Sequence, residues 1–547
     1  MLSKFFNKKW KRFSALGVML IIGLSAIKDS GFFEVTKNLE IFASAYKEVH
    51  LNYVEEVNPG ELMKTGIDAM LASLDPYTNY YTESEVEDAL IKRKGDFGTP
   101  GIEVALMQNR IVITAIKSGS SADLLGVRLG DIIMEINQRD FSNKSVSETY
   151  EAFEGAVGSI LKIKIMRGTD LLEFNLERQK TDFSNVPYYG MATKEYGYIK
   201  LDQFMEGSAA EVKSAFLELK KNAQLEGLIL DLRNNGGGLL IDAIRILNLF
   251  LNKDQVLVVT RGRTDEYYQE YKTFDTPLDT IIPLVVLINE NSASASEIVA
   301  GTIQDMDRGI VIGQNSYGKG LVQNVIPLPY RNQIKVTIAK YYIPSGRCIQ
   351  EIDYSKHKHK DSSALTKPFF TKNKRKVYEG TGIKPDIVQE KPISSAFFSA
   401  LRNGSYIFDF ATEYFKQNPD SVAIESFSLK PSVYDDFRQF CLSKGFTYQT
   451  QTEIEVERIK STAIQEQLNQ DVENSITSLK TQINKNKDKD WERYKDIVLS
   501  LLNIEISKRY YGEKNLYPII FKFDKDIKRA IDILGNTREY NQVLNKL

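Results

Sequence analysis

The sequence is poor in the residues that most often build metal and redox sites. Its 547 residues include 2 cysteines, Cys348 and Cys441, and 3 histidines. Two distant cysteines provide neither a disulfide framework nor a cysteine-rich metal site, and we expect them not to pair. No metal or cofactor is expected. Charge is balanced, with 71 basic and 72 acidic residues, so nothing points to nucleic acid as a partner.

Long apolar runs are also scarce, and the most prominent one lies near the N-terminus. It covers Phe13–Ile27 and follows Lys4, Lys8, Lys9, Lys11 and Arg12. As a helix it would span about 22 Å, short of the roughly 30 Å hydrocarbon core of a bilayer. A basic segment before a short apolar one is typical of an export signal. Residues 1–30 are therefore predicted to be a signal peptide, with membrane anchoring through residues 13–27 as the alternative. Both place the protein in the periplasm or cell envelope.

The segment Leu284–Gln323 carries the chemistry. An apolar run, Leu284–Ile288, predicts a buried strand, and the small residues Asn291–Ser296 separate it from a helical pattern that begins at Glu297. A second strand is predicted over Gly309–Gly313. A serine at a strand-to-helix turn is exposed at a helix N-terminus, where free N–H groups suit a developing oxyanion. The pattern favours acyl transfer by a serine.

Such a serine needs a base, and histidine is a poor candidate here. His50 lies in a helical pattern near the N-terminus, while His357 and His359 lie in a lysine-rich polar loop, where we expect solvent exposure rather than metal binding. Lys319, between two glycines, is the better base. Its pKa would have to fall from about 10.4 to roughly 7, which requires a largely buried amine. Gln323, four residues on, is placed to orient it.

These residues resemble one family, the carboxyl-terminal processing (tail-specific) proteases, which are PDZ-containing serine peptidases with a Ser/Lys pair. The resemblance is carried by Ser292–Gly301, Gln304–Asp305, Arg308 and Gly318–Gln323. It implies Ser294 as nucleophile, Lys319 as base and Gln323 as the residue that orients the lysine. Chemistry alone does not distinguish Ser294 from Ser292 or Ser296.

The oxyanion hole follows from the same resemblance. A predicted strand, Leu228–Leu232, leads into Arg233–Gly238, whose sequence is RNNGGG. Glycines after a parallel strand allow close approach of backbone to a ligand. The family motif implies one donor N–H from Gly237, with Gly238 as second choice, and another from Ala295.

Two other interpretations of the segment explain less of its sequence. Gly313 and Gly318-Lys319 have nearly the spacing of a nucleotide-binding P-loop, but Gly320 replaces the Ser/Thr that would bind magnesium. A strand pattern also follows, where a P-loop requires a helix. The serines could instead be a simple helix cap, an interpretation that leaves the neighbouring matches unexplained.

The fold class predicted is multidomain α/β (α+β). Residues 31–90 are expected to be N-terminal helices and residues 91–180 a PDZ-like β-domain. Residues 181–392 would form an α/β serine-protease core with ββα-type repeats and a polar insert over 354–375, and residues 393–547 a C-terminal helical domain. The PDZ resemblance lies in Phe97–Asn137 and implies a carboxylate-binding loop for the C-terminus of a peptide. Its residues would be Gly98, Thr99, Gly101 and Ile102.

The C-terminal helical domain has no counterpart in the common core of the family. One apolar face is predicted over Ile464–Ile483, and a last helix over Ile527–Leu534. The domain would control access, dimerise or dock an adaptor. The function predicted is that of an exported serine endopeptidase that cleaves polypeptides near C-termini recognised by the PDZ domain. The alternative is a PDZ-bearing scaffold or recruiting protein with an inactive protease-like domain.

Overall fold

The structure, a computed structural model, describes residues 30–86, 97–180, 184–354, 358–359, 368–390, 395–420, 423–512 and 515–546. The chain divides into two compact units, one of Met1–Tyr81 with Ile326–Lys335, the other of Thr82–Val325 with Val336–Leu547. Residues 1–29 of the predicted signal segment lie outside the described residues. Among the helices that the structure describes, none has the length and apolar character needed to cross a bilayer.

The described part of the first unit contains two helices, α2 (Ser30–Asn52) and α3 (Pro59–Ala72), as the apolar periodicity predicts. Asn58 caps α3 by accepting from the N–H groups of Gly60 and Glu61, and Pro59 occupies the first helical turn. The short strand β1 (Asn79–Tyr81) pairs antiparallel with the start of β19 (Gln333–Tyr342), Asn79 opposite Lys335.

The PDZ-like region of the second unit is a sheet in the order β3-β4-β5-β8-β9, with β6 paired to β5. A small second sheet has the order β10-β2-β7. The core of this region includes the fully buried side chains of Ile111, Ile133 and Leu161, which lie on strands of the larger sheet. The bounds are β2 Phe97–Thr99, β3 Ile102–Met107, β4 Arg110–Ile116, α5 Ser121–Leu124, β5 Ile132–Ile136, β6 Arg139–Asp140, α6 Val146–Phe153, β7 Gly155–Ala156, β8 Ile160–Arg167, β9 Asp170–Glu177 and β10 Gln179–Lys180.

The protease-like core is built on a sheet in the order β11-β12-β13-β16-β17-β24, parallel from β12 onward. Its elements are β11 Tyr188–Met191, β12 Tyr196–Lys200, α7 Ser208–Leu219, β13 Gly227–Asp231, α8 Leu240–Phe250, β16 Leu284–Ile288, α9 Ala295–Asp305, β17 Ile310–Gly313 and β24 Ile387–Val388. Beside it β14 (Val256–Gly262) pairs with β15 (Gln269–Lys272) and with the second part of β19, to which β18 (Leu321–Pro327) also pairs. A 3₁₀ turn, η1, covers Asp265–Tyr267.

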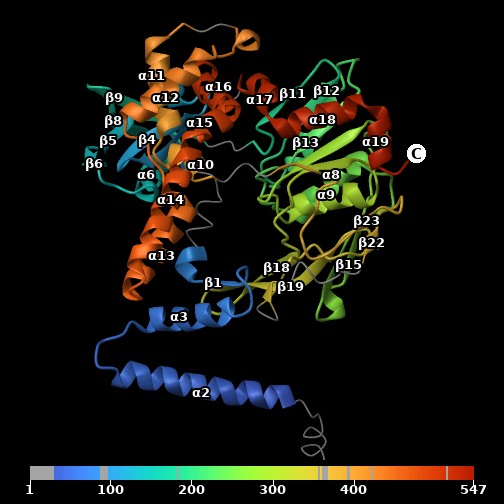
Figure 1. Cartoon of the computed structure of the whole chain (residues 1–547). Helices are drawn as coiled ribbons and strands as arrows, with labels where there is room; N and C mark the ends of the chain where they lie inside the picture. The colour runs from blue at the N-terminus through green and yellow to red at the C-terminus, as the bar shows by residue number, and fades with distance from the viewer. Residues whose placement is uncertain are drawn as a thin grey trace, which may run out of the picture. The chain divides into compact units, whose positions relative to one another are not determined.

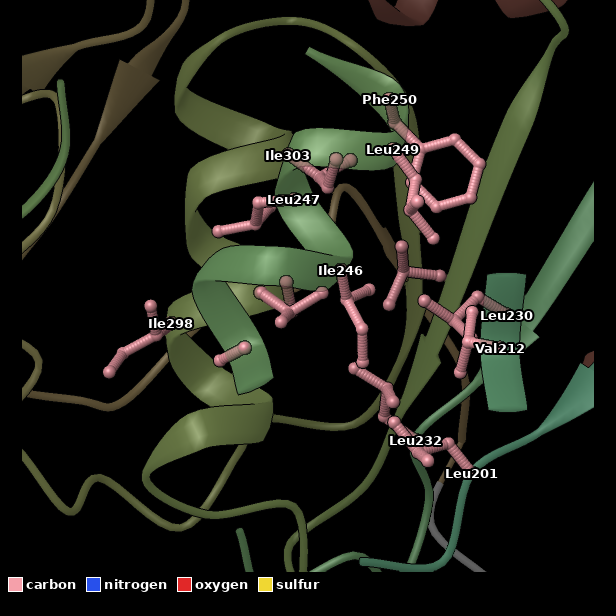
Figure 2. Packing of buried hydrophobic residues seen from close by; sticks show 14 of the residues in the cluster. Leu201, Val212, Leu230, Leu232, Ile246, Leu247, Leu249, Phe250, Ile298 and Ile303 are labelled. Atoms are coloured by element: carbon pink, nitrogen blue, oxygen red, sulfur yellow. The ribbon is translucent and has the colours of Figure 1, made fainter. Parts of the chain in front are cut away.

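Parallel neighbours that follow in chain order require crossovers of one hand, so their helices lie on one face of the sheet. Accordingly α7, α8 and α9 form one core with Leu201, Leu230 and Leu232. Figure 2 shows Ile246 and Phe250 of α8 and Ile298 of α9 gathered in this cluster. Every residue of α9 is buried, so this helix is central to the core and not merely amphipathic.

The opposite face of the sheet is equally apolar, because side chains alternate along a strand. Ile229, Val285 and Ile312 point to this second face and pack against the last helices of the chain. These are α17 (Tyr517–Phe523), α18 (Lys525–Gly535) and α19 (Thr537–Val543), drawn in red beside the sheet in Figure 1. The single helical domain expected over 393–547 is therefore shared between two hydrophobic cores.

The other C-terminal helices pack around a core of their own, which contains Phe397, Tyr434, Phe437 and Trp491. They are α10 Ala396–Asn403, α11 Tyr406–Gln417, η3 Ile424–Ser426, α12 Ser432–Ser443, α15 Asp490–Arg493 and α16 Lys495–Tyr511. Helices α13 (Gln451–Gln465) and α14 (Asn469–Asp488) contribute none of their described side chains to this core and are joined to each other by the ion pairs Lys480–Glu457 and Lys487–Glu453. The apolar face predicted over Ile464–Ile483 is interrupted: its second part lies on α14, where Ile476 is buried, but its first part does not continue into that helix.

Helix α13 ends at Gln465, Gln467 follows with a φ of 60°, and α14 begins at Asn469. Ile464 and Leu468, at the break, are exposed.

Within and beside the polar insert, the described residues form short strands: β20 Ile352–Asp353, β21 Lys358–His359, β22 Phe369–Phe370 and β23 Lys376–Val377. Much of it, including His357, lies outside the described residues. Both cysteines are free, Cys441 in the helical core. The predicted fold class is confirmed: N-terminal helices, a PDZ-like sheet, an α/β core and C-terminal helices.

Candidate active site

Three adjacent parallel strands, β13, β16 and β17, end at the same edge of the sheet. The glycine loop follows β13, the serine turn follows β16, and the loop that carries Lys319 follows β17. In parallel α/β sheets, sites form outside the carboxyl ends of the strands. The topology therefore brings together segments that lie up to about ninety residues apart in the sequence.

Ser294 occupies the N-cap position of α9 with φ 55° and ψ −110°. This backbone conformation is strained for any residue other than glycine. The two neighbouring serines differ from it. Ser292 Oγ donates to the carbonyl of Leu232 and Ser296 Oγ to the carbonyl of Asn235, each at 2.8 Å, and both serines are fully buried. These two hydroxyls hold the glycine loop against the turn.

Gly237 lies directly against the serine turn. A β-carbon placed on it would be 2.6 Å from the carbonyl oxygen of Ala293, 2.9 Å from Ser294 Cβ and 3.0 Å from the backbone nitrogen of Ala295. Its φ of 96° also favours glycine. Ala295 is the first residue of α9, so its N–H has no acceptor within the helix. The N–H of Gly237, however, donates to Oδ1 of Asn235 at 2.9 Å.

Glu297 is the residue of this site that the sequence did not single out. Its side chain is fully buried beneath Ser294, and its carboxylate accepts four hydrogen bonds. One oxygen accepts from the N–H groups of Ser294 (2.7 Å) and Lys319 (2.9 Å), the other from Ser316 Oγ (2.6 Å) and the N–H of Gly318 (2.7 Å). Burial raises the pKa of Glu297 from 4.5 to about 7, against the opposing effect of these donors.

One carboxylate oxygen thus joins the backbone of Ser294 to that of Lys319. The signal that could have revealed Glu297 is its place three residues after Ser294, the spacing of a capping box. Sequence could not show that the same carboxylate reaches a second loop 22 residues further on.

The glycines on both sides of Lys319 are required by close packing. A β-carbon on Gly318, whose φ is 83°, would lie 2.5 Å from Glu351 Cβ, and one on Gly320 would lie 2.4 Å from the backbone nitrogen of Gln350. Lys319 itself is half-buried. Gln323 lies on β18, where its Nε2 donates to Thr337 Oγ1 at 3.2 Å.

Two arginines, Arg347 buried and Arg375 partly buried, hold the C-terminal end of α9. Arg347 donates to Gln304 Oε1 at 2.7 Å and to Asp305 at 2.8 Å, while Arg375 donates to the carbonyl of Gln304 at 2.9 Å and pairs with Asp386. A buried ion pair is retained only with such additional hydrogen bonds. The arginines therefore tie the chain just before the polar insert, and the last residue of the insert, to the C-terminal end of α9.

The expected carboxylate-binding loop is partly a strand. Gly98 and Thr99 lie in β2, which pairs with β10 on one side and β7 on the other. Gly101 has a φ of 78°, and Ile102 begins β3. No strand of the described residues covers the outer edge of β3. On that strand the N–H of Val104 donates to the hydroxyl of Tyr150 on α6 at 3.3 Å.

Within the described ranges no group of histidine, cysteine, aspartate and glutamate side chains could hold a metal ion. His50 lies on α2, in the other unit. What the described residues provide is a strained serine at a helix N-terminus, backbone N–H groups close to it, and a lysine-bearing loop attached through Glu297.

Three protein families match the chain in sequence order. The PDZ domain family matches residues 90–166, peptidase family S41 residues 195–357, and the family described as "Probable PDZ-protease, C-terminal helical domain" residues 397–534. The chain is thus a serine-type peptidase that carries a PDZ domain.

Among curated relatives, the carboxy-terminal-processing protease of Bartonella bacilliformis is 33% identical over 390 residues, which cover 70% of this chain and 82% of that protein. A probable CtpA-like serine protease of Staphylococcus haemolyticus is 28% identical over 399 residues, 72% of this chain and 73% of that protein. The chain belongs to the carboxyl-terminal processing protease family. Among solved structures, a photosystem II D1 C-terminal processing protease is 24% identical, covers 64% of this chain and 92% of that one, and has a TM-score of 0.37.

Proposed function

We propose that the chain is an exported endopeptidase that uses Ser294 and Lys319 to cleave polypeptides near their C-termini. The observation that carries the proposal is the shared carboxylate oxygen of Glu297, which accepts from the N–H groups of both residues. A scaffold without catalysis would not need a strained serine, and strain of about 1–3 kcal/mol is retained mainly at functional sites.

In this mechanism Ser294 Oγ attacks the scissile carbonyl while the neutral amine of Lys319 accepts the hydroxyl proton. The negative charge that develops on the carbonyl oxygen is stabilised by the N–H groups of Ala295 and Gly237. Lys319 then returns the proton to the leaving amine, and the acyl-enzyme ester is hydrolysed by a water that Lys319 deprotonates. Gln323 is the residue proposed to orient the lysine.

The Gly237 donor requires one change of partner. Its N–H donates to Asn235 Oδ1, so an incoming oxyanion has to replace that amide oxygen as acceptor. A charged acceptor forms the stronger hydrogen bond. The Gly237 N–H should therefore bind the charged oxygen of the transition state more strongly than the neutral carbonyl oxygen of the substrate. An interaction that is stronger in the transition state accelerates the reaction.

The test compares Ser294→Ala with Ser292→Ala and Ser296→Ala, using an N-terminally tagged polypeptide with an apolar C-terminus and mass spectrometry of the products. Ser294→Ala should abolish cleavage and leave the melting temperature nearly unchanged. The two comparison variants each lose a buried hydrogen bond to the glycine loop, worth about 1 kcal/mol of stability, but keep the nucleophile, so their activity per folded molecule should fall far less than that of Ser294→Ala. Activity in Ser294→Ala would refute the assignment.

For the PDZ-like region we propose that a substrate tail adds as a strand to the open edge of β3, with its carboxylate near Gly101 and Ile102. Gly98 and Thr99 are less suited, since their strand is paired on both sides. Amidating the substrate's C-terminus keeps every side chain and removes the charge. It should slow cleavage about 10- to 150-fold, the value of a charge-assisted hydrogen bond of about 1.5–3 kcal/mol. Equal rates for both substrates would exclude this role.

A further inference from the structure

Arg233, which opens the glycine loop, is held by carboxylates from two distant parts of the chain. It pairs with Asp231, two residues earlier, at 2.6 Å, with Asp524 at 2.9 Å and with Asp526 at 3.1 Å. All four side chains are largely buried, Asp231 almost completely. Burial opposes the ionisation of Asp231, but the positive charges of Arg233 and Lys200 lower its pKa to about 2.

The two distant carboxylates have fixed positions. Both lie at the beginning of α18, where Asp524 accepts from the N–H groups of Asp526 and Ile527 as the N-cap. The helix is anchored to the second face of the core sheet by Ile527 and Ile533, both fully buried. Its N-terminus is also where negative charge is most favourable. The helix therefore presents two carboxylates to Arg233 from a rigid element.

From Arg233 the loop runs directly to the serine turn. The N–H of Asn234 donates to Asn289 Oδ1 at 2.8 Å, and the carbonyl of Asn235 accepts from the N–H of Ala293 at 3.0 Å. Gly237 follows, in contact with the turn itself. One end of the loop is thus fixed by the turn after β16 and the other by α18.

We propose that Asp524 and Asp526 are positioning residues for catalysis, which act through Arg233 to hold the oxyanion-hole loop in register with Ser294. This inference rests on the proposed function. It makes the last helices of the chain part of the catalytic unit, not an accessory domain. The N–H groups of the loop contribute most in the transition state, so a displaced loop should reduce kcat and leave KM unchanged.

The variant that tests this is Asp524→Asn/Asp526→Asn in the full-length protein. Asparagine is as good an N-cap as aspartate, so α18 keeps its first turn. Arg233 keeps Asp231, so no buried charge is left alone. The matched control is Asp532→Asn, an exposed carboxylate on the same helix.

With the tagged substrate, kcat of the double variant should fall about 10- to 100-fold, as expected when an oxyanion donor is misplaced but not removed. KM and the melting temperature should stay near the wild-type values. The Ki of a peptide boronate, which forms a tetrahedral adduct with the serine, should rise in parallel with the fall in kcat. The kcat of Asp532→Asn should match that of the wild type. The variant Asp526→Glu, which keeps the carboxylate, should have a kcat close to the wild-type value.

An unchanged kcat in the double variant would overturn the inference, as would a loss that only follows the fraction of unfolded protein. If the double variant does not fold, Asp526→Asn alone decides, since it leaves the cap residue in place: a lower kcat supports the inference and an unchanged kcat refutes it. A wild type without Ser294-dependent cleavage would refute the proposed function and this inference together. A cleaving wild type with an unaffected double variant refutes the inference alone.

Discussion

The replacement Gly237→Ala adds one methyl group at the closest approach of the glycine loop to the serine turn. Its β-carbon would lie 2.6 Å from the carbonyl oxygen of Ala293 and 2.9 Å from Ser294 Cβ, where ordinary contacts are 3.4–4 Å. The neighbouring atoms belong to backbone and to the nucleophile, and neither can turn away. Alanine would also have to adopt a φ of 96°. The loop must therefore move away from the turn by roughly half an ångström or more.

Two effects of known size follow. Positive φ and overpacking together should destabilise the fold by about 2–4 kcal/mol, which lowers the melting temperature of a core this size by roughly 5–15 °C. Displacement of the loop weakens the hydrogen bonds to the oxyanion, and removal of one such donor costs about 10²- to 10³-fold in kcat. We expect the loss of kcat in Gly237→Ala to be near that range when it is measured well below the melting temperature. KM should change little.

Gly236→Ala is the matched control. Gly236 is exposed, a β-carbon there would meet nothing within 4 Å, and its φ is not positive. This variant should keep kcat and match or slightly exceed the wild-type melting temperature, since alanine restricts the unfolded chain. Equal kcat for Gly237→Ala and Gly236→Ala would show that the reaction does not depend on the contact between loop and turn.

Further predictions concern Lys319 as the base, the buried carboxylate of Glu297, and the open edge of β3 in the PDZ-like region. Lys319→Arg should be as inactive as Lys319→Ala, because arginine cannot give up its proton in a protein, and appreciable activity in the arginine variant would reduce Lys319 to an electrostatic role. The ionised form of Glu297 is the one that accepts from both Ser294 and Lys319, so kcat should rise as pH passes about 7, and this step should be absent from the pH profile of Glu297→Gln. Stability has the opposite sign: because the folded pKa lies above the unfolded value, the contribution of Glu297 is full below 4.5 and is lost as pH rises through about 7, a dependence that thermal melts of the two proteins would detect. Tyr150→Phe frees the N–H of Val104 on the open edge of β3 and should lower KM for substrates with a free C-terminus, whereas a raised KM would mean that the hydroxyl assists binding.

Many secondary-structure elements and the catalytic motifs of this protein can be predicted from local sequence patterns. Leu284–Ile288 was predicted as a strand from its unbroken apolar run and is β16, and a helical periodicity over Ala209–Leu219, which the sequence also contains, covers all but the first residue of α7. The resemblance to the family is carried by Ser292–Gly301 and Gly318–Gln323, short motifs whose residues lie close together in the sequence. These features depend on residues that are near one another in the sequence. They can therefore be predicted without knowing how the elements pack.

Contacts between distant segments were decided only by the tertiary structure. Glu297 follows Ser294 by three residues, but its second set of donors comes from another loop that is brought near by the pairing of β16 with β17. Asp524 gives no sign in the sequence of reaching Arg233, 291 residues earlier. Helices α17–α19 have an apolar face like any other amphipathic helix. Which core receives that face depends on the open side of the sheet, and that side exists because the crossovers place α7, α8 and α9 on the other one.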